Sequence, residues 1–195
     1  SSLVESVAFT PDGRRLVVGS SHEVIKVWDF IANESMDLVG HGTRAGIVAV
    51  SRDGKKFATG GWDGKVIIWD SAGTKLIEYQ GHRLPNTPPE HIKTVLSICF
   101  SPDSKQIVSA AYHHNPLAVR IKSELKIWSV ETGETLATLE GEHIESRSFA
   151  ILCATYSPDG KLIATGSFGN NVKGFKVKLW DAKTGKVLRS MEGHT

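Results

Sequence analysis

The stretch VAVSRDGKKFATGGWDGKVIIWD, residues 48–70, carries the pattern that decides the fold. Short runs rich in Val, Ile, Phe and Ala are separated by turn residues at 52–54 and 60–64, and the last run ends on Trp69-Asp70. β-Branched and aromatic residues in short runs between Gly- and Asp-containing turns are typical of antiparallel strands. The stretch therefore predicts three strands joined by tight turns.

The same pattern occurs four times in the 195 residues, at 7–29, 48–70, 98–129 and 154–181. In each copy the third run ends on a tryptophan, and a fourth short run follows after a further turn, as at 135–139. Each copy thus predicts four strands, and no segment shows the 3.6-residue period of a helix. A four-stranded antiparallel unit cannot bury both of its faces alone, so we expect the four units to stack radially.

Gly-His lies at one end of the repeats and Trp-Asp at the other, at Trp28-Asp29, Trp69-Asp70 and Trp180-Asp181, while Trp128-Ser129 departs. With these motifs the chain resembles the WD-repeat β-propeller family over essentially its whole length. The resemblance implies an all-β propeller with four four-stranded antiparallel blades in a single region, 1–195. The blades are expected at about 1–39, 40–80, 81–140 and 141–192.

In that family a buried His, Ser or Thr, Asp and Trp form a hydrogen-bonded chain that holds each blade together. By this resemblance the second blade has the full set, which consists of His41, Thr59, Asp63 and Trp69. The other sets are incomplete: His82, Ser109 and Trp128 in the third blade, His143, Thr165 and Trp180 in the fourth, and Val18 and His22 at the Thr and Asp positions of the first. Without the Asp, we expect these three blades to be held more by packing than by polar networks.

The repeats begin and end in phase. The first unit starts at its innermost strand, near residues 3–9, and the fourth ends with its outermost strand, near residues 187–191, so Gly193-His194-Thr195 is expected to lead into a further blade. Three arrangements fit this: four blades closed on themselves, two chains joined head to tail in an eight-bladed ring, or an excised part of a longer propeller. We favour the homodimer, because a fragment leaves a large apolar patch in water.

Insertions are confined to one edge of the predicted propeller. From the turn Asp to the Trp, the first two blades span 16 residues, the third 25 and the fourth 21. From the Gly of Gly-His or Gly-Glu-His to the next turn Asp, the second blade spans 13 residues, the third 22 and the fourth 18. In WD-repeat propellers both loop types open on the same edge, which we call the top rim. Insertions often map to a binding face, so we expect this rim to bind a protein or peptide.

Candidate contact residues on the top rim are three aromatics at equivalent positions and three arginines, namely Trp62, Tyr112, Phe168, Arg44, Arg83 and Arg120. Exposed aromatics would anchor a partner; alternatively, they fold back over the inserted loops. The arginines could recognise an acidic peptide, but a net charge of +2 argues against nucleic acid. His91, His113 and His114 have no spacing that fixes tetrahedral ligation, so no metal site is predicted.

No catalytic motif appears in the sequence, so we expect a non-catalytic interaction scaffold without a cofactor. The alternative is an architectural or engineered propeller fragment, or a sensor segment of a larger protein, with no ligand of its own. No run of about eighteen apolar residues indicates a membrane span. Cys99 and Cys153 are too few for a disulfide framework and are expected to be small core residues of innermost strands, which suits an intracellular protein, and we expect the cytoplasm.

Overall fold

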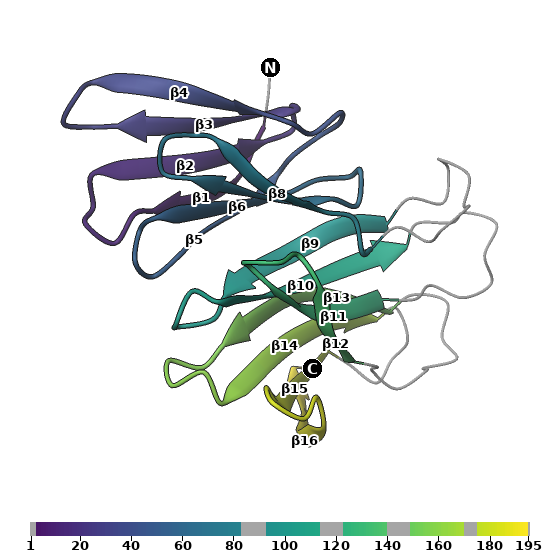
Figure 1. The fold of residues 1–195 in the computed structure, drawn as a ribbon. Helices are drawn as coiled ribbons and strands as arrows, with labels where there is room; N and C mark the ends of the chain where they lie inside the picture. The colour runs from purple at the N-terminus through teal and green to yellow at the C-terminus, as the bar shows by residue number, and fades with distance from the viewer. Residues whose placement is uncertain (1–2, 83–92, 114–122, 140–148, 170–174, 195) are drawn as a thin grey trace.

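The fold consists of four four-stranded antiparallel sheets in a computed structural model that describes residues 3–82, 93–113, 123–139, 149–169 and 175–194. Each sheet runs in sequence order from its innermost to its outermost strand (Figure 1). The strands are β1 (Val4–Phe9), β2 (Arg15–Ser20), β3 (Val24–Asp29), β4 (Glu34–Val39), β5 (Ile47–Val50), β6 (Lys56–Gly60), β7 (Val66–Asp70), β8 (Lys75–Tyr79), β9 (Lys93–Phe100), β10 (Gln106–His113), β11 (Ser123–Ser129), β12 (Thr135–Leu139), β13 (Phe149–Tyr156), β14 (Leu162–Gly169), β15 (Phe175–Asp181) and β16 (Val187–His194). The predicted all-β architecture of four four-stranded units is confirmed.

Successive blades pack face to face, and their innermost strands β1, β5, β9 and β13 contact one another in that order. One apolar core lies between each neighbouring pair of blades among the described residues. Val17 and Leu38 of the first blade, for example, share a core with Phe57 and Trp69 of the second. Since successive side chains of each strand point to opposite faces of the sheet, one blade needs two neighbours to bury both of its faces.

The blade tryptophans face the preceding blade. Trp69, Trp128 and Trp180 are at most 2% exposed, because each packs on the blade before it. Tyr79 of the second blade stacks on Trp128 of the third, with ring centroids 4.4 Å apart and planes 4° from parallel. Trp28 of the first blade is 47% exposed, since no described residue covers that side.

The exposed side of the first blade, formed by Val7, Phe9, Trp28 and Val39, is named the open face. Its strands carry the same alternation as the buried faces of the other blades. Its exposure means that the four blades do not close on themselves in this structure.

Two expectations from the sequence differ from the structure. Strand β16 continues through Gly193 to His194, which pairs with Phe175, so these residues form the end of a strand rather than a loop. Cys153 lies in the innermost strand β13 as expected, but its side chain is exposed, because it belongs to the side of the fourth blade that no described residue covers. Cys99, at the covered junction of the third and fourth blades, is partly buried.

Candidate functional site at the top rim

The second blade contains a continuous buried hydrogen-bond chain below the top rim. His41 Nδ1 lies 3.1 Å from both carboxylate oxygens of Asp63, and His41 Nε2 lies 2.8 Å from Thr59 Oγ1. The indole of Trp69 donates to the same hydroxyl oxygen over 2.9 Å. With the proton on Nδ1, His41 donates to Asp63 and accepts from Thr59, so every group has a partner. Burial by itself raises the pKa of Asp63, but the bonds from His41 and the Lys65 amide outweigh it and leave the pKa below its ordinary value.

The third blade has a polar network of its own, although it was expected to be held more by packing than by polar networks. His82 Nε2 lies 2.7 Å from Ser109 Oγ, which also accepts from the Trp128 indole over 3.1 Å. His82 Nδ1 lies 3.1 Å from Oε2 of Glu124, which also accepts from Lys93 over 2.8 Å. Glu124, near the start of β11, thus bonds to Nδ1 of His82 as Asp63 bonds to Nδ1 of His41.

Electrostatics at this cluster keep Glu124 ionised. Burial raises the pKa of Glu124, but the hydrogen bonds from His82 and Lys93 outweigh it and lower the pKa to about 2. Burial lowers the pKa of His82, so the imidazole is neutral near pH 7 and donates from Nδ1 to the carboxylate. Lys126 lies 3.3 Å from the second carboxylate oxygen, so two ammonium groups surround one acid.

Glu124 was not predicted from the sequence, because it does not occupy the position of the family's Asp in the turn between the second and third strands. It lies after residues 114–122, near the start of the third strand. One signal was available: it is the first acidic residue after that insertion and stands four residues before Trp128. A carboxylate in the first residues of the third strand is within reach of the His that precedes the first strand. The missing Asp is therefore replaced from a different strand position.

The first and fourth blades have less polar support among the described residues. In the fourth, the Trp180 indole donates to Thr165 Oγ1 over 3.0 Å, and the predicted partner His143 lies outside the described residues. In the first, Val18 cannot hydrogen-bond through its side chain and His22 is exposed. Trp28 of this blade is exposed for the same reason as the rest of the open face, because no described residue packs on it.

An ordered, exposed aromatic lies on the top rim at the junction of the first two blades. Trp62, two residues after the end of β6, is 51% exposed, and the guanidinium carbon of Arg44 lies 4.5 Å from the centre of its ring. The Trp62 amide donates to the Arg44 carbonyl over 2.9 Å, and Arg44 forms an ion pair with Glu5 of the first blade. A cation over an indole face is attractive and fixes the ring's orientation. We call these three residues the Trp62 cluster.

The remaining predicted contact residues are less fully described. Tyr112, in β10, is half-buried at the same end of its strand as Trp62 is in its blade. Phe168 lies in β14, where it pairs with Ala150, and nothing is described of its side chain. The predicted contact residues Arg83 and Arg120 lie outside the described residues, as do His91 and His114, which were not assigned to a site. Of the predicted contact residues that are described, the structure therefore brings together Trp62 and Arg44.

Comparison with curated proteins gives relatives that cover nearly the whole chain. A ribosome biogenesis protein WDR12 homolog of Drosophila virilis is 28% identical over 96% of this chain and 43% of its own length. The small ribosomal subunit protein RACK1y of Oryza sativa subsp. japonica is 29% identical over 89% of the chain and 48% of its own length. Apoptotic protease-activating factor 1 of Rattus norvegicus is 26% identical over 95% of the chain and 13% of its own length. The chain thus spans less than half the length of each of these relatives.

A family model described as the cytochrome D1 heme domain matches residues 2–193. A haem requires an axial ligand such as His, Cys, Met or Tyr. The rings of His41 and His82 are already committed at both nitrogens within their blades. A pocket of about 330 Å³ between the first two blades is lined by Thr, Pro, Asp, Arg, Gly and Ser residues, none of which is such a ligand. The described part of the chain also holds no group of three His, Cys, Asp or Glu side chains suited to a metal ion. These residues do not fit a haem.

Four sheets of four strands, the buried His-Thr-Asp-Trp chain of the second blade and the WD-repeat relatives agree on one fold family. The chain therefore belongs to the WD-repeat β-propellers, and the family model that its sequence matches is that of the cytochrome D1 heme domain.

Proposed function

We propose that the chain is a non-catalytic scaffold that binds a protein or peptide through the top rim. The observation that carries this proposal is the Trp62 cluster, in which a half-exposed indole is held by Arg44 and Glu5 at a junction of blades. Large aromatics in a fixed orientation lose little entropy on binding and often dominate interface energy. Arg44 adds donors beside the ring for a carboxylate of the partner.

The relatives support this class of function through their names. One is a ribosome biogenesis protein, one a ribosomal subunit protein and one a cell division cofactor of the APC complex, in Arabidopsis thaliana. All three names describe proteins that work within larger assemblies, which also supports an intracellular setting. Within the described residues no helix is long and apolar enough to cross a membrane.

The alternative is an architectural segment with no ligand of its own. This is favoured by one observation, namely that the chain spans 13% to 48% of the length of the relatives above. A rim with the Trp62 cluster but no partner would fit that role. The two functions are separated by whether the rim aromatics affect any interaction.

The test is a comparison of captured proteins between the wild-type chain and a variant with Trp62, Tyr112 and Phe168 all replaced by Ser. Phe30→Ser is the matched control, because Phe30 is 55% exposed but lies in the turn after β3, at the opposite edge. We expect a defined set of proteins to be held by the wild type and by Phe30→Ser and lost from the triple variant. Identical captured sets from the triple variant and the wild type would contradict rim binding.

A second part of the proposal is that two chains join head to tail as an eight-bladed ring. The open face supports it, because Trp28 is 47% exposed where Trp69, Trp128 and Trp180 are at most 2% exposed. Burial of such a face stabilises association by about 25 cal/mol per Å² of apolar surface. A two-fold arrangement closes after two chains and adds no further copies. Sedimentation at equilibrium should then give twice the 21.2 kDa chain mass at micromolar concentration.

A further inference from the structure

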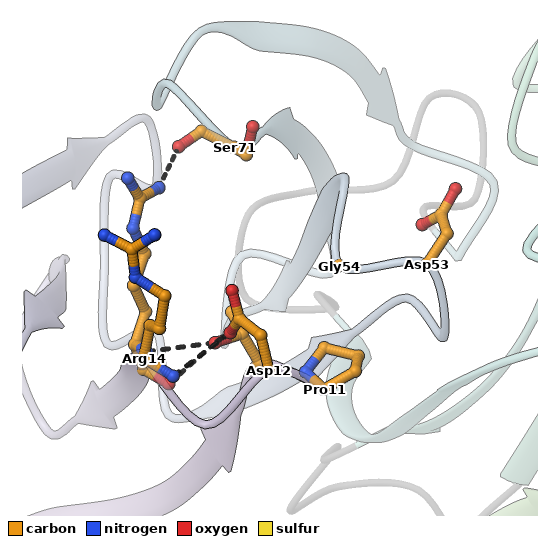
Figure 2. Close-up of a pocket in the computed structure, with 8 residues that line it drawn as sticks. Pro11, Asp12, Arg14, Asp53, Gly54 and Ser71 are labelled. Atoms are coloured by element: carbon orange, nitrogen blue, oxygen red, sulfur yellow. Dashed lines mark hydrogen bonds between the residues drawn. The ribbon is translucent and has the colours of Figure 1, made fainter.

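A contact between a proline and a glycine recurs where neighbouring blades meet at the edge opposite the top rim. Pro11, in the turn between β1 and β2, lies against Gly54 in the equivalent turn of the second blade (Figure 2). A Cβ placed on Gly54 would lie 3.3 Å from Pro11 Cδ. The same contact joins Pro102 of the third blade to Gly160 of the fourth, at 3.4 Å. Both glycines have positive φ, so the residue is set by the turn as well as by the neighbour.

At the junction of the second and third blades both members of the pair change together. The proline position holds Arg52, and the glycine position holds Ser104, which keeps the positive φ at 60°. The proline of one blade and the glycine of the next thus occur as a matched pair at two junctions and are both absent at the remaining one. This indicates that the two positions act as a unit across a junction.

The two ends of the array carry the unused halves of this contact. Gly13 of the first blade has φ 69° and no atom within 4 Å of where a Cβ would lie. Pro158 of the fourth blade is exposed in the turn between β13 and β14. Pro158 thus has no glycine against it among the described residues, and Gly13 has no proline. Together they could form one more junction of the Pro11–Gly54 type.

A second recurrent contact points to the same junction. In the turns between the third and fourth strands, a positive-φ glycine packs on an apolar side chain of the preceding blade's outermost strand: Gly73 on Leu38, Gly133 on Ile77 and Gly185 on Leu139. At the ends of the array the corresponding residues are Asn33, also at positive φ, and two residues of β16. By strand register these are Arg189 at the position of Ile77 and Met191 at the position of Leu38 and Leu139, and all three are exposed. Met191 is thus an exposed apolar side chain at the position that packs on a positive-φ glycine at two internal junctions.

The open face also carries the residues of a buried junction. Lys26 stands two residues before Trp28, as Lys126 stands before Trp128 and Lys178 before Trp180. Lys178 is buried and Lys126 is largely buried against the preceding blade, while Lys26 is half-exposed and paired with Asp37. The first blade is therefore built like an internal blade on the side that lies open.

We propose that the open face of one chain is covered by the fourth blade of a second copy, with Pro158 of that copy seated on Gly13 and its Met191 beside Asn33. This inference rests on the proposed ring and adds the residues that set its register. Other WD-type blades that carry a proline in the same turn would fit the same surface, but only a second copy makes the purified chain a dimer by itself.

The test is sedimentation equilibrium of the purified full chain with two single variants and their combination. Pro158→Arg copies the residue at position 52, so the turn is expected to form, while the proline contact is lost. Gly13→Asn keeps the positive φ that Asn tolerates but fills the space in front of Gly13. Each single variant is expected to raise the dimer dissociation constant about tenfold, the change that 1.4 kcal/mol of interface energy gives. The dimer dissociation constant of the double variant is expected to lie less than tenfold above that of the weaker single variant. The effects do not add, because both changes act on one contact.

Pro102→Ala is the matched control, because Pro102 meets Gly160 within the same chain. It is expected to lower the denaturation midpoint and to leave the dimer mass unchanged. A dimer that resists both Pro158→Arg and Gly13→Asn would overturn this register while leaving the ring proposal in place. A wild-type chain of 21.2 kDa at all concentrations would overturn the ring and the register together, and neither result bears on rim binding.

Discussion

His82 Nδ1 lies 3.1 Å from Oε2 of Glu124, and this pair replaces in the third blade the His41–Asp63 pair of the second. The two residues come from opposite sides of the blade's insertions, since His82 directly precedes segment 83–92 and Glu124 follows segment 114–122. Lys93, at the other end of the first insertion, binds the same carboxylate. One acid thus fixes the bases of both inserted segments on the proposed binding rim.

Replacing this acid should destabilise the chain. Glu124→Gln keeps the shape and one acceptor for His82 but leaves the buried ammonium of Lys93 without a counter-charge. Removal of one member of a buried ion pair costs about 3 kcal/mol. We therefore expect a lower urea midpoint for Glu124→Gln. Glu131→Gln, at an exposed turn position, is the control and should unfold with the wild type. Equal midpoints for the two variants would show that Glu124 is not part of a buried network.

The same residue gives a pH dependence whose sign follows from its pKa. The pKa of Glu124 is lowered from 4.5 to about 2 in the folded chain, so the unfolded chain takes up this proton first as the pH falls. The stability that Glu124 contributes is complete above pH 4.5 and is lost as the pH falls from there towards 2. The stability difference between the wild type and Glu124→Gln should therefore shrink across this range. A difference that stays constant from pH 6 to pH 3, measured by urea unfolding, would contradict the assignment.

How far the sequence predicts the structure varies with the kind of interaction. Strand order and the four units follow from local patterns, such as the turn at 52–54 and the run that ends on Trp69, because turn chemistry and alternation act within a few residues. In the third blade Glu124 takes the role that Asp63 has in the second blade, and this could not be predicted from the family motif. It depends on which side chain reaches His82 across two strands, and an insertion had removed the expected position.

Exposure was also hard to predict, since it depends on neighbours rather than on a residue's own repeat. Trp28 and Trp69 occupy the same motif position, but among the described residues only Trp69 packs on a neighbouring blade. Cys153 likewise lies in an innermost strand as expected, while its exposure reflects the uncovered side of the fourth blade. Repeats therefore specify a blade's shape, and their number and closure specify which faces are buried.

The second blade provides the sharpest contrast between two aspartates. Asp63→Ala should destabilise by about 1–3 kcal/mol, because it leaves the buried His41 imidazole without its acceptor. Asp12 accepts from the Thr10 hydroxyl and the Arg14 amide in an exposed turn, where water can replace it. Asp12→Ala should therefore cost clearly less than Asp63→Ala in a urea titration. Equal losses at the two sites would remove the special role given to the buried chain.

The last prediction uses the chain's own tryptophans to report on the open face. Of the five tryptophans, only Trp28 and Trp62 are substantially exposed, while Trp69, Trp128 and Trp180 are buried between blades. In a Trp62→Phe variant, acrylamide quenching of the exposed fraction therefore comes from Trp28. If a second copy covers the open face, this quenching should fall as the protein concentration rises through the dimer dissociation constant. Adding Pro158→Arg should shift the fall to higher concentration, since the register contact is lost. Quenching that is independent of concentration, in a sample that sediments as a dimer, would mean that the two copies meet through a different surface.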